Sequence, residues 1–305
     1  MDRIIETLHE AYRSKGQGRV EMPPKPGVHP RADCHLHAMP AFVPDLGAVG
    51  IKWVGAFPPN GPKGLPQISG LIVLNDADTG MPVCVMDCRW ITAKRTGAKT
   101  AVAAKYLARS SAASVGIVGC GVQGRSNLEA LCLGFDIGAV RAYDVSRQAA
   151  EKFAAETSCQ RFKVEVVGSA EAAVLDMDLV VTSGPIRRRP EPVIQEAWLK
   201  PGCFCAPVDF DSYFTGQAMR AMDVFATDDL PQFEYYRSLG YFTGAPKGAQ
   251  IFDLGSIACD EALRRTDDKQ RTMSMSLGTG MDDVVVAPLV FDAAQRKGLG
   301  TRLEL

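Results

Sequence analysis

The chain has 305 residues, of which 46% are hydrophobic and 23% are charged, and this composition is typical of a globular protein with enough apolar material for about two compact domains. The 34 basic and 35 acidic side chains leave a net charge of −1, which provides no long-range attraction for nucleic acid or for an anionic membrane. The nine cysteines form no CxxC pair, and we expect them to be reduced core residues. The sequence shows no secretory signal and no apolar run near the roughly 20 residues of a membrane span, so we expect a cytoplasmic protein.

The first third of the chain predicts one helix followed by a sheet. Residues 3–13 carry apolar side chains at helical spacing, which predicts an amphipathic helix. Residues 20–90 lose this periodicity, and turn-forming residues at 75–80 predict a hairpin within them. The expected strands are the β-rich runs 50–54, 71–74 and 82–86. The alanine-rich run 96–109 predicts a helix that leads into the next region.

The middle of the chain alternates apolar strand runs with helical segments, a pattern that builds a parallel sheet covered on both faces. The expected strands are 114–118, 139–143, 162–166, 179–182, 203–208 and 223–226, and the expected helices are 123–134, 147–157 and 169–174. Near the end, residues 281–297 predict a further helix, in which Pro288 lacks a backbone donor and is a potential kink. The sequence therefore predicts an α/β protein with a doubly wound, Rossmann-type sheet.

A glycine-rich turn follows the first strand of this sheet. In Gly119-Cys120-Gly121-Val122-Gln123-Gly124, the first glycine permits a tight turn, the second lets the backbone approach a pyrophosphate, and the third allows close packing of helix on strand. The helix that starts near Gln123 points free amides at that phosphate. Such a turn can also be purely structural, but its position between a strand and a helix favours dinucleotide binding.

The next strand ends in Asp144, a carboxylate that can accept hydrogen bonds from an adenosine ribose. A carboxylate repels a 2′-phosphate, so it favours NAD. The neighbouring Ser146 and Arg147 could serve a phosphate, so NADP remains possible. The basic run 187–189 has two interpretations, a solvated loop or a binding site for an anion of cofactor or substrate.

Three charged residues are candidates for the substrate side of the site. Lys52 interrupts an apolar strand, and Arg95, which lies just before the alanine-rich helix, could hold a carboxylate with two hydrogen bonds. Asp209 follows a strand of the predicted parallel sheet, at the edge where ligands gather. His35 and His37 alternate on a predicted strand beside Cys34, but no third and fourth ligand has a recognisable spacing, so we predict packed histidines near the cleft and no metal.

Together these segments resemble the ornithine cyclodeaminase and mu-crystallin family, and within it the archaeal-type alanine dehydrogenases. The matching segments are AMPA at 38–41, GIKWV at 50–54, PN at 59–60, GLP at 64–66, LIVLNDADTGMPVCVMD at 71–87, RTGAKTAVAAKYLAR at 95–109, GIVGCGVQGRSNLEAL at 116–131, SLGTGMDD at 276–283 and GLGTRLEL at 298–305. They are distributed over nearly the whole chain.

The resemblance implies a homodimer with two domains. Residues 1–110 and 280–305 would form an α+β domain for substrate binding and dimerisation, and residues 111–279 the Rossmann domain inserted between them. It also implies that Lys52 and Arg95 hold the substrate and that Asp209 is the acid/base. The residues expected to bind the cofactor are Thr96, Gly119, Gly121, Val122, Gln123, Gly124, Asp144, Val145, Ser146, Arg147, Thr182, Ser183, Val208 and Ser276.

Three departures from the family pattern bear on the substrate. The glutamate that holds a distal amine in cyclodeaminases is replaced by His37, and the usual arginine of the preceding Pro-rich stretch is replaced by Lys25. The Pro-Gly-Lys pattern that follows the acid/base is replaced by the loop 210–214. We therefore expect Lys25 and His37 to bind the substrate and to alter its identity.

The leading interpretation is an NAD(P)-dependent oxidoreductase that reduces an imine, or a 2-oxo acid with an amine, to an L-amino acid. One alternative is an ammonia lyase of the ornithine cyclodeaminase type. Another is a protein that binds NAD(P)H without catalysis. In each case the partner is a small amino or imino acid, with no nucleic acid and no membrane.

Overall fold

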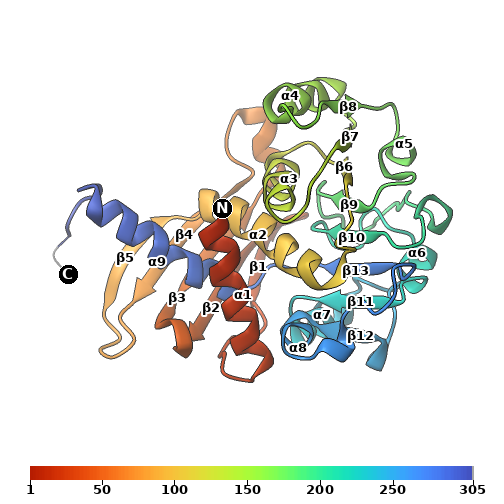
Figure 1. The fold of residues 1–305 in the computed structure, drawn as a ribbon. Helices are drawn as coiled ribbons and strands as arrows, with labels where there is room; N and C mark the ends of the chain where they lie inside the picture. Colours follow the sequence, from red (N-terminus) through yellow and green to blue (C-terminus); the bar gives the residue numbers. More distant parts are fainter. Residues whose placement is uncertain (304–305) are drawn as a thin grey trace.

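The computed structural model describes residues 1–303, and these residues form two lobes built on separate sheets (Figure 1). The first sheet is antiparallel and has five strands in the order β1-β2-β3-β4-β5. Its strands are β1 Gly27–Arg31, β2 Cys34–Val43, β3 Ala48–Ala56, β4 Ile68–Asn75 and β5 Pro82–Asp87. The predicted runs 50–54, 71–74 and 82–86 are confirmed as β3, β4 and β5.

The second sheet is parallel and has eight strands in the order β12-β11-β13-β10-β9-β6-β7-β8. Its strands are β6 Ser114–Val118, β7 Ala139–Tyr143, β8 Val164–Val166, β9 Leu179–Thr182, β10 Phe204–Pro207, β11 Val224–Thr227, β12 Ile251–Asp253 and β13 Thr272–Met275. All residues of β9, β10, β11 and β13 are buried, as expected for strands covered on both faces. The chain order reverses between β6 and β9, which is where open parallel sheets bind ligands.

Helices cover both sheets and join the lobes. They are α1 Asp2–Gly16, α2 Arg89–Leu107, α3 Val122–Gly134, α4 Arg147–Thr157, α5 Ala170–Val174, α6 Gly216–Arg220, α7 Leu230–Ser238, α8 Leu254–Cys259 and α9 Gly280–Arg296. Short 3-10 turns are η1 Pro44–Leu46, η2 Pro58–Lys63, η3 Glu196–Trp198, η4 Gly248–Gln250 and η5 Glu261–Leu263. In Figure 1, α9 runs along the antiparallel sheet, whereas α3 and α4 lie on one side of the parallel sheet and α5 and α6 on the other. The predicted α/β fold with a doubly wound sheet is confirmed.

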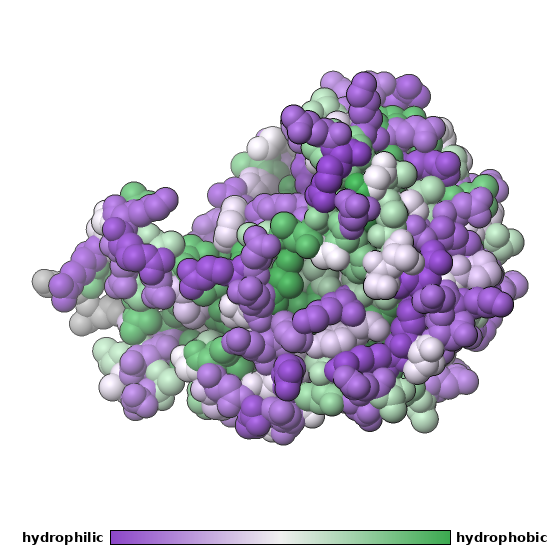
Figure 2. All heavy atoms as spheres, viewed as in Figure 1, coloured by the Kyte–Doolittle hydropathy of each residue, from purple (hydrophilic) through white to green (hydrophobic). Residues whose placement is uncertain are grey.

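The antiparallel sheet has two different faces because successive side chains of a strand point to opposite sides. Lys52 of β3 is paired with Met39 and Ile72, and all three are buried on the side that α9 covers. The alternating residues Trp53 and Leu71 lie on the opposite side and are 42% and 50% exposed. Figure 2 shows hydrophobic side chains gathered over the middle of the molecule, where the two lobes meet.

Several element boundaries differ from the prediction. The helix predicted at 96–109 begins at Arg89, because Ile91 and Ala93 extend its buried face, and the strand predicted at 162–166 is only Val164–Val166. Helix α9 continues through Pro288, which confirms the prediction of one helix near the end of the chain. All nine cysteines are free thiols, but the expectation of core residues is wrong for Cys159 and Cys259, which are exposed, and Cys84 and Cys132 are only half-buried.

Strands β6 to β13 lie within residues 114–275, and α9 packs against the first sheet. Residues 304 and 305, at the end of the expected substrate domain, lie outside the described residues. Within residues 1–303, no helix combines the length and apolarity needed to cross a membrane.

Candidate active site

A cavity of about 650 Å³ lies between the two lobes, at the carboxyl edge of the parallel sheet. Both lobes contribute to it: β2 and β3 from the antiparallel sheet, the start of α2, and the loops after β6, β9, β10 and β13. Many residues predicted for substrate and cofactor meet here. Those that line the cavity are Lys25, His37, Lys52, Arg95, Thr96, Gly119, Gly121, Gln123, Asp144, Ser183, Val208 and Ser276.

The glycine turn forms one end of the cavity, and its three glycines have different surroundings. Gly119 has a φ of 99°, and a Cβ there would lie 2.7 Å from the backbone carbon of Ser183. A Cβ on Gly124 would lie 2.4 Å from the carbonyl oxygen of Gly119. A Cβ on Gly121 would meet nothing within 4 Å, so this residue borders open space at the start of α3. Open space beside free helix amides is the surrounding that a pyrophosphate requires.

Asp144 lies at the end of β7 and is fixed against the glycine turn. Its Oδ2 accepts a hydrogen bond from the Cys120 amide at 2.8 Å, and its Oδ1 accepts one from the Ser146 amide at 2.9 Å. Ser146 caps α4 through its hydroxyl, and Arg147 pairs with Glu151 at 2.9 Å on the surface. Both residues therefore have other contacts, while the carboxylate stays at the edge of the cavity.

The opposite end of the cavity is built on a buried ionic network. Lys52 donates to Asp283 Oδ2, and the Arg95 Nη1 lies 3.4 Å from Asp282 Oδ2. The Arg95 Nε lies 3.3 Å from Asp283 Oδ1 without forming a hydrogen bond. Both aspartates are fully buried in the first turn of α9. Acidic residues at this position are stabilised by the free amides of the helix.

Thr279 explains why α9 begins at this point. Its side chain accepts a hydrogen bond from the Asp282 amide, while the Asp282 carboxylate accepts one from the Thr279 amide. Asp282 also accepts a hydrogen bond from Tyr12 of α1 at 3.0 Å. Asp282 and Asp283 were not among the predicted site residues, although the Thr-x-x-Asp pattern before an apolar helix is a signal for them.

Lys99 and Asp228 complete the network behind the cavity wall, and both were missed in the sequence analysis. Lys99 donates to Asp228 and lies 3.6 Å from Asp282. The buried cations are Lys25, Lys52, Arg95 and Lys99, and the buried carboxylates in contact with them are Asp228, Asp282 and Asp283. In this network, cations outnumber carboxylates by one. Three of the cations, Lys25, Lys52 and Arg95, line the cavity, whereas the three carboxylates do not. The cavity therefore favours an anionic ligand at this end.

Among residues 1–303, no carboxylate lies within hydrogen-bond distance of the Lys25 ammonium group. Its Nζ donates to the carbonyl oxygens of Leu277 at 2.6 Å and Gly278 at 3.1 Å. Burial lowers the pKa of Lys25 to about 7, an effect that the charge of Asp228 only partly offsets. Burial likewise lowers the pKa of Lys52 to about 8 in spite of its pairing with Asp283. A bound carboxylate would raise both pKa values and so bind together with protons.

Asp209 lies directly beneath the cavity, between the lining residues Val208 and Phe210. Its Oδ1 accepts a hydrogen bond from Thr182 at 2.7 Å and its Oδ2 accepts one from the Gly184 amide at 2.9 Å. Burial raises the pKa of Asp209 to about 7, although both hydrogen bonds oppose the shift. A carboxyl group with such a pKa can give or take a proton near neutral pH.

Not every predicted residue lines the cavity. The side chains outside the lining are those of Val122, Gly124, Val145, Ser146, Arg147, Thr182 and Asp209. Val145 is 90% exposed, and Thr182 is fully buried beside Asp209. Of the basic run 187–189, Arg188 reaches the cavity.

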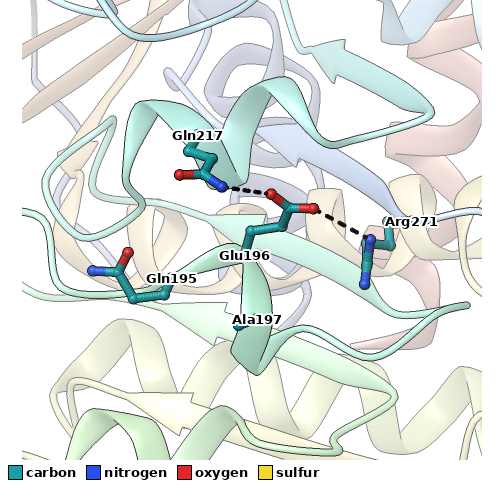
Figure 3. A pocket seen from close by; sticks show the side chains of 5 residues that line it. All are labelled: Gln195, Glu196, Ala197, Gln217 and Arg271. Atoms are coloured by element: carbon teal, nitrogen blue, oxygen red, sulfur yellow. Dashed lines mark hydrogen bonds and ion pairs between the residues drawn. The ribbon is translucent and has the colours of Figure 1, made fainter.

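A smaller depression of about 330 Å³ lies away from this cavity, on the parallel-sheet lobe (Figure 3). Glu196 at its centre accepts a hydrogen bond from Gln217 at 2.9 Å and pairs with Arg271 at 3.8 Å. The only acidic group among its lining residues is therefore already paired. This depression offers no chemistry comparable to that of the cavity between the lobes.

A doubly wound sheet with a glycine turn at its switch point, joined to a second lobe that supplies buried cations, defines a two-lobed protein of the dinucleotide-binding class. The model of the ornithine cyclodeaminase/mu-crystallin family matches residues 1–298, and the chain belongs to this family. The resemblance inferred from the sequence is therefore confirmed.

Its relatives include enzymes of known type. The alanine dehydrogenase of Archaeoglobus fulgidus is 33% identical over 317 aligned positions, which cover 100% of this chain and 94% of that protein. The Thermococcus litoralis Δ1-pyrroline-2-carboxylate reductase, solved with NADH and L-proline, has a TM-score of 0.88 at 28% identity and covers 99% of this chain and 96% of its own. An archaeal alanine dehydrogenase dimer with bound NAD has a TM-score of 0.87 at 32% identity, and the match covers 100% of this chain and 95% of that one. These relatives confirm the expected class, oxidoreductases that use NAD and act on amino acids or imines.

Proposed function

We propose that the protein is an NAD-dependent oxidoreductase that reduces the C=N bond of a 2-imino acid to give an L-amino acid. The observation that carries this proposal is the single cavity that joins the glycine turn to three buried cations. The imine would be preformed, or would arise from a 2-oxo acid and an amine. The balanced reaction consumes one imino acid, one NADH and one proton, and yields one amino acid and NAD⁺.

The roles of the chain's own residues follow from their positions. Lys52 and Arg95 line the cavity and are held by the carboxylates of α9, so they would bind and orient the substrate carboxylate. Bound NADH would supply a hydride to the substrate carbon C2. Asp209 would supply the proton that the substrate nitrogen needs, after a small change that opens it to the cavity.

The cofactor assignment rests on Asp144. Its carboxylate lies where an adenosine ribose is bound in sheets of this type, and a 2′-phosphate there would meet a negative charge. Ser146 is engaged as a helix cap and Arg147 pairs with Glu151, so neither is free to offset that charge without losing its contact. We therefore expect NADH to be used in preference to NADPH.

We also propose a homodimer formed through the exposed face of the antiparallel sheet. Phe42, Val49, Ile51, Trp53, Leu71, Val73 and Val85 alternate with the residues that α9 covers, and so share this face. A contiguous apolar surface of this kind is rare on a monomer. The archaeal alanine dehydrogenase relative is a dimer, which supports the same assembly here.

The alternatives fit the cavity less well. A cyclodeaminase acting on a diamine needs an anion for the distal amine, but His37 occupies that part of the wall and Lys25 lies nearby. A protein that only stores the nucleotide would not need Lys52 and Arg95 held in a costly buried network.

The test is NADH and NADPH oxidation measured with pyruvate, glyoxylate, oxaloacetate and cyclic imines, each with and without ammonium. We expect oxidation of NADH with at least one of them. No oxidation with any member of the panel would contradict the reductase assignment.

A further inference from the structure

Three of the four histidines of the chain line one wall of the cavity. His29 lies on β1, and His35 and His37 lie on β2. The rings of His35 and His37 are stacked with centroids 4.2 Å apart, and the ring of His29 follows at 6.4 Å from that of His35. We call this row the histidine ladder. It runs from the exposed strand β1 to the buried Lys25 and Tyr236.

The backbone is shaped to hold the inner member of the ladder. Gly27 is paired with His37 across the two strands, and a Cβ at Gly27 would lie 2.3 Å from the His37 Cδ2. The imidazole therefore occupies space that only a glycine leaves free. Within residues 1–303, the hydrogen bond found for a ladder ring is a long one of 3.5 Å between His37 and Tyr236. The other ring nitrogens of the ladder are thus available to a ligand in the cavity.

The charges around the ladder are almost all positive. Lys25 approaches from the segment before β1 and Lys52 from β3, while Tyr236 and Tyr241 face it from α7 and the following loop. Burial, and then the charge of Lys25, lower the pKa of His35 to about 4 and that of His37 further still. Without a ligand the rings are therefore neutral at pH 7, and a nearby anion would favour their protonation.

Carboxylates are scarce in this part of the cavity. Among the described lining residues the acidic side chains are Asp33, which is exposed at the outer end, and Asp144, which lies at the glycine turn. A distal ammonium group on a substrate would find no buried anion beside the ladder. A metal ion is not indicated either, because the described residues contain no cluster of three suitable ligands.

We propose that the histidine ladder binds a second anionic group, a carboxylate at the end of the substrate side chain. This inference rests on the proposed function, in which Lys52 and Arg95 bind the first carboxylate. The substrates would then be dicarboxylic 2-imino acids, and the products acidic L-amino acids. Each imidazole can donate an N–H to the distal carboxylate, and Lys25 supplies a positive charge at the inner end.

The test measures binding by calorimetry to the enzyme saturated with NADH, because NADH and an L-amino acid cannot react with each other and the result does not depend on turnover. The probes are two matched sets: L-aspartate, L-asparagine and L-2,4-diaminobutyrate, and L-glutamate, L-glutamine and L-ornithine. We expect an acidic amino acid to bind at least about tenfold more tightly than its amide, the ratio that a charge-assisted hydrogen bond provides. The diamines should bind most weakly.

Variants assign the preference to the ladder. The double variant His35→Gln/His37→Gln should bind the acidic amino acid and its amide about equally. The variant Gly27→Ala, which displaces the His37 ring, should reduce the preference without removing a histidine. His29 lies on an exposed strand, so the variant His29→Gln changes no buried residue. It should weaken binding of the longer acid, L-glutamate. His9→Gln is the matched control, because His9 lies on α1 outside the cavity, and it should retain the wild-type preference.

Equal binding of acid and amide by the wild-type enzyme, or an unchanged preference in the double variant, would overturn the proposal. If monocarboxylic substrates oxidise NADH while no preference for acids is found, the proposed function stands and this inference fails. If no amino acid binds and no substrate oxidises NADH, both fail.

Discussion

Replacing Asp283 by asparagine removes the charge that faces Lys52 at the base of the cavity. Both side chains are buried, at 1% exposure for Lys52 and 0% for Asp283, and Asp283 also lies 3.3 Å from the Arg95 Nε. The substitution keeps the size of the side chain, so the change is electrostatic. It leaves Lys52 as a buried cation without its carboxylate partner.

The expected loss of stability follows from this burial. Removing one member of a buried ion pair costs about 3–5 kcal/mol in the free energy of unfolding. Unfolding entropy is about 2.1 cal/mol/K per residue, which gives about 0.6 kcal/mol/K for 305 residues, and hence a fall in Tm of about 5–8 °C.

The dependence on pH gives the prediction a second, independent check. Burial lowers the pKa of Lys52 to about 8, below its value in the unfolded chain, so the charged form is present in the folded protein at pH 7 and is largely lost at pH 9. Asp283 stabilises only the charged form. The difference in Tm between wild type and Asp283→Asn should therefore be smaller at pH 9 than at pH 7.

Thermal unfolding followed by circular dichroism at the two pH values measures this. Glu129→Gln is the control, because Glu129 pairs with Lys94 at the surface, and its loss should cost less than about 1 kcal/mol. A fall in Tm no larger than that of the control, or an equal fall at pH 7 and pH 9, would refute the electrostatic reasoning.

Three further predictions concern the cofactor, the proton and the dimer. Gly121→Ala should leave Tm unchanged but weaken NADH binding at least about tenfold in fluorescence titrations, because its Cβ would enter open space where the phosphate is expected. Gly119→Ala should lower Tm as well, because its φ is 99° and Ser183 is close. The kcat/KM for imine reduction should fall as the pH rises above about 7, because the Asp209 carboxyl and the Lys25 ammonium, both with a pKa of about 7, then lose their protons. A flat profile from about pH 6 to 9 would argue against both roles. Trp53→Arg should convert the proposed dimer to a monomer in light scattering, and an unchanged mass would exclude this face as the interface.

Six strands of the parallel sheet were predicted because each is a local apolar run bounded by turn residues, whereas β12 and β13 were not predicted. The glycine turn is also local, and Gly119 and Gly124 make the close contacts that its spacing implied. Lys52 was recognisable because a lysine within GIKWV conflicts with its apolar neighbours. Arg95 and Asp209 were candidates from their positions beside a helix and a strand, and the family resemblance implied their roles; they lie at or next to the cavity.

The rest depends on contacts between segments far apart in the chain. Asp283 is 231 positions from Lys52, and Asp228 is 129 positions from Lys99, so no local pattern shows that these charges meet. The position of His29 beside His35 depends on the pairing of β1 with β2, and β1 was not predicted because its residues are exposed and include a proline. The burial of Asp209 likewise follows from packing around Thr182 and Gly184.

The most direct test of the central claim follows the hydride itself. NADH carrying deuterium at both positions of C4 of the nicotinamide ring is incubated with the enzyme and a 2-imino acid, either a cyclic imine or a 2-oxo acid with ammonium, and the product is examined by NMR. The account predicts an L-amino acid that carries deuterium at C2, and loss of this product in Asp209→Asn while NADH still binds. Oxidation of NADH without deuterium at C2, or no oxidation with any imine, would contradict it.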